Sequence, residues 1–238
     1  MRIFVTPEQL VRGELVVSGD EHHYLARVRR ARGGEIVELV DGEGRRARAE
    51  IARITDASTI LRVDDPEEIV ALPPVVRVLV PLIKGDRMDS CVEKLVEVGA
   101  DTIIVWQAAR SIVRLDDSKR QTRLAHYQAI AVAGARQSGR ASVPEVMWAG
   151  SLAVGITQLP PGHRLVLDPT SDRPISVALV AGSLDVAIAS GPEGGLTTDE
   201  LGELASANFA SVGLGPRVLR ADTAPVAAVA IVRAATNT

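Results

Sequence analysis

Two glycine-rich loops, each placed directly after an apolar run, constrain the fold of this chain most strongly. The first loop is residues 190–195 (SGPEGG), after the apolar residues 186–189; the second is residues 214–224 (LGPRVLRADTA), after the apolar residues 210–214. Short apolar runs that end in Gly and Pro predict buried strands, and glycine lets a backbone approach a ligand closely. Because the carboxyl ends of parallel strands line one crevice, we expect the two loops to share a small-molecule pocket. Either loop alone is equally well explained as a tight turn.

The chain around these loops alternates strand and helix patterns from residue 73 onward. Predicted strands cover residues 75–80, 102–106, 165–168, 186–189 and 210–214, and predicted helices cover residues 86–98, 117–137 and 197–207 and begin again at residue 222. Such alternation predicts an α/β domain with a largely parallel sheet.

The first 72 residues have a different pattern, of short apolar alternations between turns. Predicted strands cover residues 2–5, 15–17, 35–40, 47–54 and 59–63, with one helix over residues 20–30. Short strands of this kind favour a small β-barrel. Acidic residues and prolines between residues 64 and 74 indicate a linker, so we expect domains at 1–72 and 73–238.

Composition narrows the functional classes. The chain is 46% apolar and carries a net charge of −3, which predicts a folded core and argues against a general polyanion binder. The single Cys91 excludes an internal disulfide, and no basic segment precedes a long apolar run at the amino terminus. We therefore expect a soluble cytoplasmic protein with no membrane segment.

Two local patterns bear on RNA and metal binding. Arginines cluster at residues 27–32 and again at residues 45–48, as an RNA-facing patch would require, although solvated surface arginines explain them nearly as well. His22 and His23 are adjacent, so on a helix their side chains diverge by about 100° and cannot chelate one metal. We expect packing or RNA contact from them, and no metal site.

The two loops together closely resemble the last two motifs of the knotted (SPOUT) RNA methyltransferases. Within that superfamily they are most similar to the 16S ribosomal RNA uracil-N3-methyltransferases. Residues 23–25 (HYL), 84–87 (KGDR) and 93–99 (EKLVEVG) also resemble segments of that family. Two positions depart from its pattern: Arg136 and Asp222 stand where glutamate is usual, and the first leaves the role of that carboxylate open.

The resemblance implies a fold, a reaction and partners. The fold is an N-terminal PUA-like β-barrel that binds RNA, followed by a C-terminal α/β trefoil-knot methyltransferase domain. The reaction is transfer of a methyl group from S-adenosylmethionine to N3 of uridine 1498 in 16S ribosomal RNA of the small subunit. The expected partners are that RNA, or the small ribosomal subunit, and a second copy of the chain in a homodimer.

The resemblance also implies site residues. A cation beside the uracil would favour its N3 anion, which suggests Arg220, with Arg217 nearby. Glu193 is the nearest candidate base, although it could equally accept hydrogen bonds from backbone amides. Expected cofactor residues are Leu167, Gly191, Pro192, Gly194, Leu214, Gly215, Val218, Leu219, Thr223 and Ala224. Expected RNA-binding residues are His23, Arg27, Arg29, Arg30, Lys84, Arg87, Gln137, Ser138 and Arg140.

Two alternatives remain open. Related knotted enzymes with a similar glycine loop methylate a ribose 2′-oxygen, so the same fold could serve that reaction. A non-catalytic RNA-binding factor in ribosome assembly would keep the RNA contacts and need no methyl donor.

Overall fold

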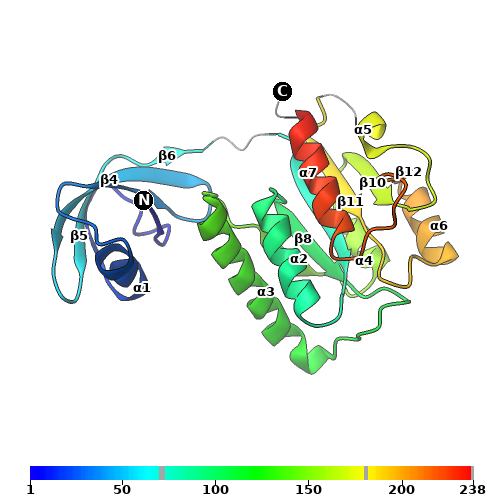
Figure 1. Cartoon of the computed structure of the whole chain (residues 1–238), viewed down its shortest axis with the longest axis horizontal. Helices are drawn as coiled ribbons and strands as arrows, with labels where there is room; N and C mark the ends of the chain where they lie inside the picture. Colours follow the sequence, from blue (N-terminus) through cyan, green and yellow to red (C-terminus); the bar gives the residue numbers. More distant parts are fainter. Residues whose placement is uncertain (70–72, 180–181, 237–238) are drawn as a thin grey trace. The chain divides into compact units, whose positions relative to one another are not determined.

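A computed structural model of the chain describes residues 1–69, 73–179 and 182–236 (Figure 1). It contains two compact units. The first comprises Met1–Ala71 together with Ala135–Val143, and the second comprises Leu72–Gly134 together with Pro144–Thr238. A short segment from the middle of the chain thus folds with the N-terminal unit, which nothing in the sequence pattern had predicted.

The N-terminal unit is built on a six-stranded sheet. Its strands are β1 (Arg2–Phe4), β2 (Gly13–Val17), β3 (Ile36–Val40), β4 (Arg45–Ile54), β5 (Thr59–Val63) and β6 (Glu67–Glu68). The order is β1-β3-β4-β5-β2 with β6 beside β4; β1 and β3 are parallel, and the other pairs are antiparallel. Alternate side chains, including Leu39, Ile51 and Leu61, are fully buried in one core. The five strands predicted for this region are confirmed, and β6 is added to them.

The helix predicted over residues 20–30 is shorter and less regular than expected. Helix α1 spans Gly19–His23 and continues into a wider π-helical turn, Tyr24–Val28. Arg30 has a φ of 51°, in the left-handed region, and so cannot continue a right-handed helix. The Leu25 side chain is fully buried and packs this segment against the core. The Leu25 carbonyl also accepts a hydrogen bond from the Ala31 amide at 2.9 Å, which closes the turn. His22 is also buried and bonds Thr59 Oγ1 through Nδ1 at 2.9 Å, so this histidine packs.

Residues 135–143 pack into this same unit through three kinds of contact. The Val143 amide donates to the Gly42 carbonyl at 2.9 Å, and the Arg136 guanidinium lies 5.2 Å from the centre of the Phe4 ring. Arg136 also forms an ion pair with Glu21 at 2.9 Å. Arg136, which stands where glutamate is usual in the family, is therefore paired with a carboxylate of the first unit.

The second unit is the α/β layered domain that the alternation predicted. Its strands are β7 (Val75–Pro81), β8 (Thr102–Trp106), β9 (Glu145–Trp148), β10 (His163–Leu167), β11 (Asp185–Ala189) and β12 (Ala210–Val212). They form one sheet in the order β12-β10-β11-β7-β8-β9, and every neighbouring pair is parallel. Parallel sheets are buried on both faces, which explains the nearly continuous apolar runs. The trefoil knot stays a prediction.

Helices cover both faces of this sheet. They are α2 (Asp86–Glu97), α3 (Asp117–Ser138), α4 (Leu152–Thr157), α5 (Ile175–Ala178), α6 (Thr198–Ser206) and α7 (Ala224–Thr236). Helices α2 and α7 lie side by side (Figure 1), whereas α4 and α6 pack together in a core with strand residues such as Leu79 and Ile104. Strand β9 and the short helices α4 and α5 were not predicted, and α7 begins two residues later than expected.

One arginine fixes the position of α7 within this unit. Arg233, in the last turn of α7, donates to the carbonyl oxygens of Pro74 (2.7 Å) and Gly99 (2.6 Å) and pairs with Asp101. Pro74 directly precedes β7, and Gly99 and Asp101 precede β8. The arginine therefore holds the C-terminal end of α7 at the amino ends of these two strands. The start of α7, at the opposite end, is thereby held near the carboxyl ends of the strands.

Candidate functional site

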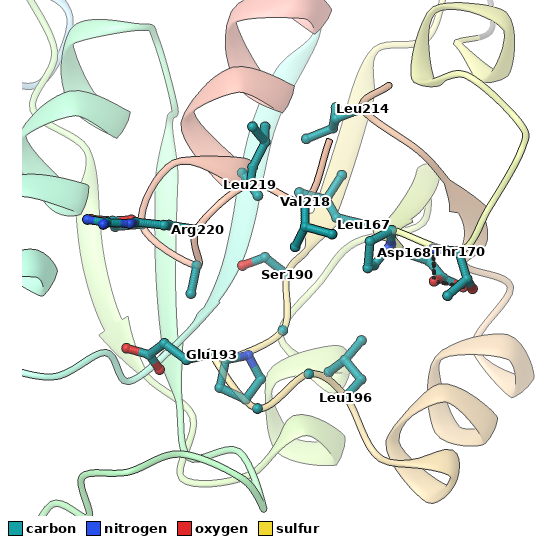
Figure 2. Close-up of a pocket in the computed structure, with 18 of the residues that line it drawn as sticks. Leu167, Asp168, Thr170, Ser190, Glu193, Leu196, Leu214, Val218, Leu219 and Arg220 are labelled. Carbon is teal, nitrogen blue, oxygen red and sulfur yellow. Dashed lines mark hydrogen bonds between the residues drawn. The ribbon is translucent and has the colours of Figure 1, made fainter. Parts of the chain in front are cut away.

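Three loops meet at the carboxyl end of the parallel sheet, because β12, β10 and β11 are adjacent and point the same way. The loops are residues 168–174 after β10, residues 190–197 after β11 and residues 213–223 after β12. Between them lies a pocket of about 630 Å³, which is drawn in Figure 2. The two glycine-rich loops therefore line one cavity, as their sequence pattern predicted.

Most of the residues expected to hold a cofactor line this pocket. They are Leu167, Gly191, Pro192, Gly194, Leu214, Gly215, Val218, Leu219 and Ala224. Thr223, although it is among the described residues, is outside the lining. Its amide donates to the Arg220 carbonyl at 2.9 Å and its hydroxyl to Asp222 Oδ1 at 3.3 Å, so it shapes the turn that precedes α7.

The three residues expected to act in catalysis, Glu193, Arg217 and Arg220, also line the pocket and are exposed. Figure 2 shows Glu193 and Arg220 on the same side of it. Within the described part of the chain, no hydrogen bond or ion pair engages any of these three side chains. A carboxylate and a guanidinium are thus both available to a ligand at this side of the pocket.

The opposite side of the pocket contains a loop that the sequence analysis left without a role. Asp168 Oδ1 accepts from the Thr170 amide at 2.9 Å and from the Thr170 hydroxyl at 2.7 Å, and both residues line the pocket (Figure 2). Asp168 had been placed at the end of a predicted strand. The rule that ligands bind at strand carboxyl ends was the available signal for it.

Apolar side chains form the middle of the pocket. Ile83, Leu196, Leu201 and Val212 were not predicted to belong to it, and they join predicted residues such as Leu167, Leu214 and Val218. Val218 is 82% exposed, so its side chain is available to contact a ligand. The middle of the pocket is therefore apolar, with Glu193 and Arg220 on one side of it and Asp168 and Thr170 on the other.

Glycines are required in the two loops that line the pocket, because a side chain would collide with neighbouring residues or strain the backbone. A Cβ added to Gly191 would lie 3.0 Å from Leu196 Cγ, and one added to Gly194 would lie 3.0 Å from Arg110 Cβ. Gly215 has a φ of 105°, a conformation that residues with a side chain rarely adopt. The local fold of both loops thus depends on these residues being glycine.

Two charged side chains hold the first glycine loop from outside the pocket. The Arg110 guanidinium donates to the carbonyl oxygens of Gly194 (3.2 Å) and Leu196 (3.4 Å). Glu200 accepts from the Thr197 amide at 2.7 Å and from the Ala109 amide at 2.8 Å, and it is 7% exposed. Because Thr197 and Glu200 form a capping box, α6 begins at a fixed point directly after this loop.

The residues expected to bind RNA divide between the two units. His23, Arg27, Arg29 and Arg30 are exposed on the first unit, with which Gln137, Ser138 and Arg140 also fold. In the second unit, Arg87 lines the pocket, whereas Lys84 is exposed and is not among the residues that line it. In the second arginine cluster, Arg45 pairs with Asp41 and Arg46 pairs with Glu67, both at 2.6 Å. Arg45 and Arg46 are therefore partly neutralised.

Cys91 is unsuited to act as a nucleophile beneath this site. It is fully buried, and burial, assisted by the nearby negative charge of Asp222, raises the pKa of its thiol to about 12. The thiol is therefore protonated at neutral pH.

Across residues 1–69, 73–179 and 182–236, no three His, Cys, Asp or Glu side chains gather as metal ligands would. Over the same ranges, none of the helices has both the length and the apolar character required to span a bilayer.

Comparison with known families gives two matches. Residues 71–233 match a model described as an RNA methyltransferase domain, and residues 17–63 match a model described as an RNA methyltransferase PUA domain. The first match contains all of the residues that line the pocket.

Similar curated proteins carry the name ribosomal RNA small subunit methyltransferase E. The protein of that name from Mycobacterium bovis is 34% identical over 93% of this chain and 87% of its own length. The Bacillus subtilis protein is 32% identical over 91% of this chain and 88% of its own length.

Solved structures give the same picture. A ribosomal RNA small subunit methyltransferase E from Neisseria gonorrhoeae, bound to S-adenosyl methionine, matches with a TM-score of 0.85 and 26% identity over 99% of this chain and 97% of that one. A methyltransferase from Legionella pneumophila, in complex with the same cofactor, matches with a TM-score of 0.83, 26% identity and the same coverage.

Proposed function

Because this chain belongs to the ribosomal RNA small subunit methyltransferase E family, we propose that it uses S-adenosylmethionine to methylate N3 of uridine 1498 in 16S ribosomal RNA. The observation that carries this proposal is the pocket at the ends of β10, β11 and β12. It joins apolar walls to one side that bears both Arg220 and Glu193.

The pocket fits the proposed methyl donor in size and in chemistry. A volume of about 630 Å³ is within the range of small-molecule sites, roughly 300–1,000 Å³. Leu167, Leu214 and Val218 would contact the apolar faces of adenine and ribose. Backbone amides and carbonyls around Gly191, Gly194 and Gly215 are accessible because these residues have no side chain.

The donor, when bound, supplies an electrophilic methyl group on a sulfonium sulfur. Nucleophilic attack by N3 requires that its imide proton leave and that the negative charge on the uracil be stabilised. Arg220 would stabilise that charge through the carbonyl oxygens of the base. Glu193, whose carboxylate no described residue engages, would accept the proton, and Arg217 would assist Arg220 in stabilising the negative charge.

The N-terminal unit would bind the RNA. Its PUA match and its exposed His23, Arg27, Arg29 and Arg30 support that role, since guanidinium groups pair with phosphates and stack on bases. Gln137, Ser138 and Arg140, which fold with this unit, would contribute to the same surface, while Lys84 and Arg87 would contact RNA from the second unit. The division into an RNA-binding domain at 1–72 and a catalytic domain at 73–238 is part of this proposal, with residues 135–143 added to the RNA-binding unit with which they fold.

The remaining parts of the proposal concern assembly and location. Helix α7 would form a homodimer interface, because its small residues allow another backbone to approach closely. The enzyme would act in the cytoplasm, where ribosomal subunits are found, and its catalytic domain would be knotted.

The test uses small ribosomal subunits from a strain that lacks this protein. We expect wild-type protein and S-adenosylmethionine to introduce a primer-extension stop at position 1498, because an N3-methyl group blocks base pairing. Nucleoside mass spectrometry should then identify N3-methyluridine. A 2′-O-methyl product would support the alternative reaction instead, and RNA binding without any methylation would support an assembly factor.

A further inference from the structure

The loop between β8 and α3, residues 107–116, packs against the first glycine loop from outside the pocket. Gln107 closes it, since its side-chain amide donates to the Val113 carbonyl at 2.9 Å and accepts from the Leu115 amide at 3.3 Å. The Ala109 amide is held by Glu200, and Arg110 binds the carbonyls of the first glycine loop. These five hydrogen bonds hold the loop in one conformation beside residues 190–197.

The exposed side of this loop combines cationic and apolar side chains. Arg110 and Arg114 are exposed, and Ile112 between them is 67% exposed. The stretch from residue 107 to residue 123 contains five Arg or Lys residues and two Asp residues, although the whole chain carries a net charge of −3. Within the loop itself Arg110 and Arg114 outnumber the one acidic residue, Asp116, so the loop carries a net positive charge beside the first glycine loop.

No carboxylate among the described residues neutralises the two arginines of this loop. The bonds of Arg110 go to carbonyl oxygens, and within the described residues Arg114 has no carboxylate partner. An uncompensated guanidinium is free to pair with a phosphate.

Guanidinium groups beside an exposed aliphatic side chain suit unpaired RNA. Phosphates pair with the cations, and an unstacked base packs its flat face on an apolar or guanidinium surface. A protein partner of acidic character would also match the charge, but the loop directly adjoins a pocket proposed to receive a nucleotide base. Charge and position together favour RNA.

We propose that residues 107–116 form an RNA-contact surface that binds the unpaired strand next to the target uridine. This inference rests on the function proposed above. Arg114 pairs with a phosphate, Ile112 packs on a flanking base, and Arg110 links this surface to the loop that holds the methyl donor. The RNA surface and the donor pocket therefore share one structural element.

The test measures binding and catalysis separately. Binding of a fluorescein-labelled 16S RNA fragment that contains position 1498 is followed by anisotropy, and S-adenosylmethionine binding by calorimetry. Arg114→Ala should raise the RNA Kd about five- to tenfold and reduce its salt dependence by roughly one phosphate contact. Ile112→Ser should raise the RNA Kd about fivefold or more. Both variants should bind S-adenosylmethionine as the wild type does.

Two further variants complete the design. Arg110→Ala should weaken both ligands, because it removes the link to the carbonyls of Gly194 and Leu196. Arg12→Ala is the matched control: Arg12 is an exposed arginine of the first unit, paired with Asp65 at 3.1 Å, and its loss changes the net charge equally. The control should leave the RNA Kd unchanged.

The possible failures are distinguishable. If Arg114→Ala and Ile112→Ser bind RNA as the wild type does, or if Arg12→Ala weakens binding equally, the RNA-contact surface is wrong whatever the wild type catalyses. If the variants behave as expected but the wild type does not methylate the small subunit, the surface stands and the proposed reaction is wrong. A wild-type protein that binds no RNA overturns both.

Discussion

Replacing Gly213 by alanine should destabilise the fold and displace the loop after β10, which lines the pocket. Gly213 is buried between β12 and the second glycine loop, and an added Cβ would overlap the carbonyl oxygen of Ser171. Its φ is not in the left-handed region, so the effect of the methyl group is steric. Because a backbone carbonyl cannot rotate away as a side chain can, residues 171–175 must move.

The cost follows from the contacts that this movement breaks. The Gly213 amide donates to the Arg173 carbonyl at 2.8 Å, and the Gly213 carbonyl accepts from the Ile175 amide at 3.1 Å. Two weakened backbone hydrogen bonds at about 1 kcal/mol each, with about 1 kcal/mol or more of overpacking, total roughly 3 kcal/mol. Since residues 168–170 line the pocket, S-adenosylmethionine should also bind about tenfold more weakly or worse.

Urea unfolding followed by circular dichroism measures the stability, and calorimetry measures the affinity. Gly202→Ala is the matched control, because a Cβ at this position of α6 meets nothing within 4 Å. Alanine there should stabilise the protein by about 0.5–1 kcal/mol. Equal stability and equal affinity for Gly213→Ala and the wild type would refute the steric argument.

Three further perturbations have distinct outcomes. Arg220→Ala should lower kcat about a hundredfold or more while changing S-adenosylmethionine affinity little, and equal losses of both would contradict its role. Burial opposes ionisation of Asp41, but amides of Arg45 and Glu43 and the Arg45 guanidinium outweigh it and lower its pKa, so the stabilisation is present above pH about 4 and lost as pH falls further. Asp41→Asn should therefore destabilise the fold more at pH 7 than at pH 3, and urea unfolding at both pH values tests this. Native protein should leave Cys91 unmodified by a thiol reagent until urea unfolds it, because the thiol is buried and its pKa is raised; rapid labelling would contradict that burial.

The parts of the fold that sequence predicted best are those in which one local signal dominates. The strands that end at Ala189 and Val212 were recognisable from their apolar runs, and the loops after them from glycine and proline. Because neighbouring parallel strands share an edge, the pocket followed from these signals together with the strand order.

The parts that it missed depend on contacts distant in sequence. Helix α4 is only six residues long and contains Gly155, at which a Cβ would lie 2.5 Å from Leu79 Cδ2; the glycine serves packing against the sheet and weakens the local helix pattern. The ion pair between Arg136 and Glu21 joins residues more than a hundred positions apart, so no spacing rule could indicate it.

The pocket lining was predicted only where the resemblance supplied residues. Asp168 and Thr170 could be recognised as lining residues only from the strand order. Because β10 lies between β11 and β12, the loop after β10 lies beside both glycine loops. The hydrogen bond from Arg110 to the Gly194 carbonyl joins residues distant in sequence, so no local pattern could indicate it.

Titration of the purified protein with S-adenosylmethionine in a calorimeter tests the central claim most directly, because every proposed step starts from a donor held between these loops. We expect one molecule bound per chain, and binding abolished by Gly191→Leu, whose side chain would collide with Leu196 and fill the pocket. An absence of binding by the wild type, or undiminished binding by Gly191→Leu, would contradict the account.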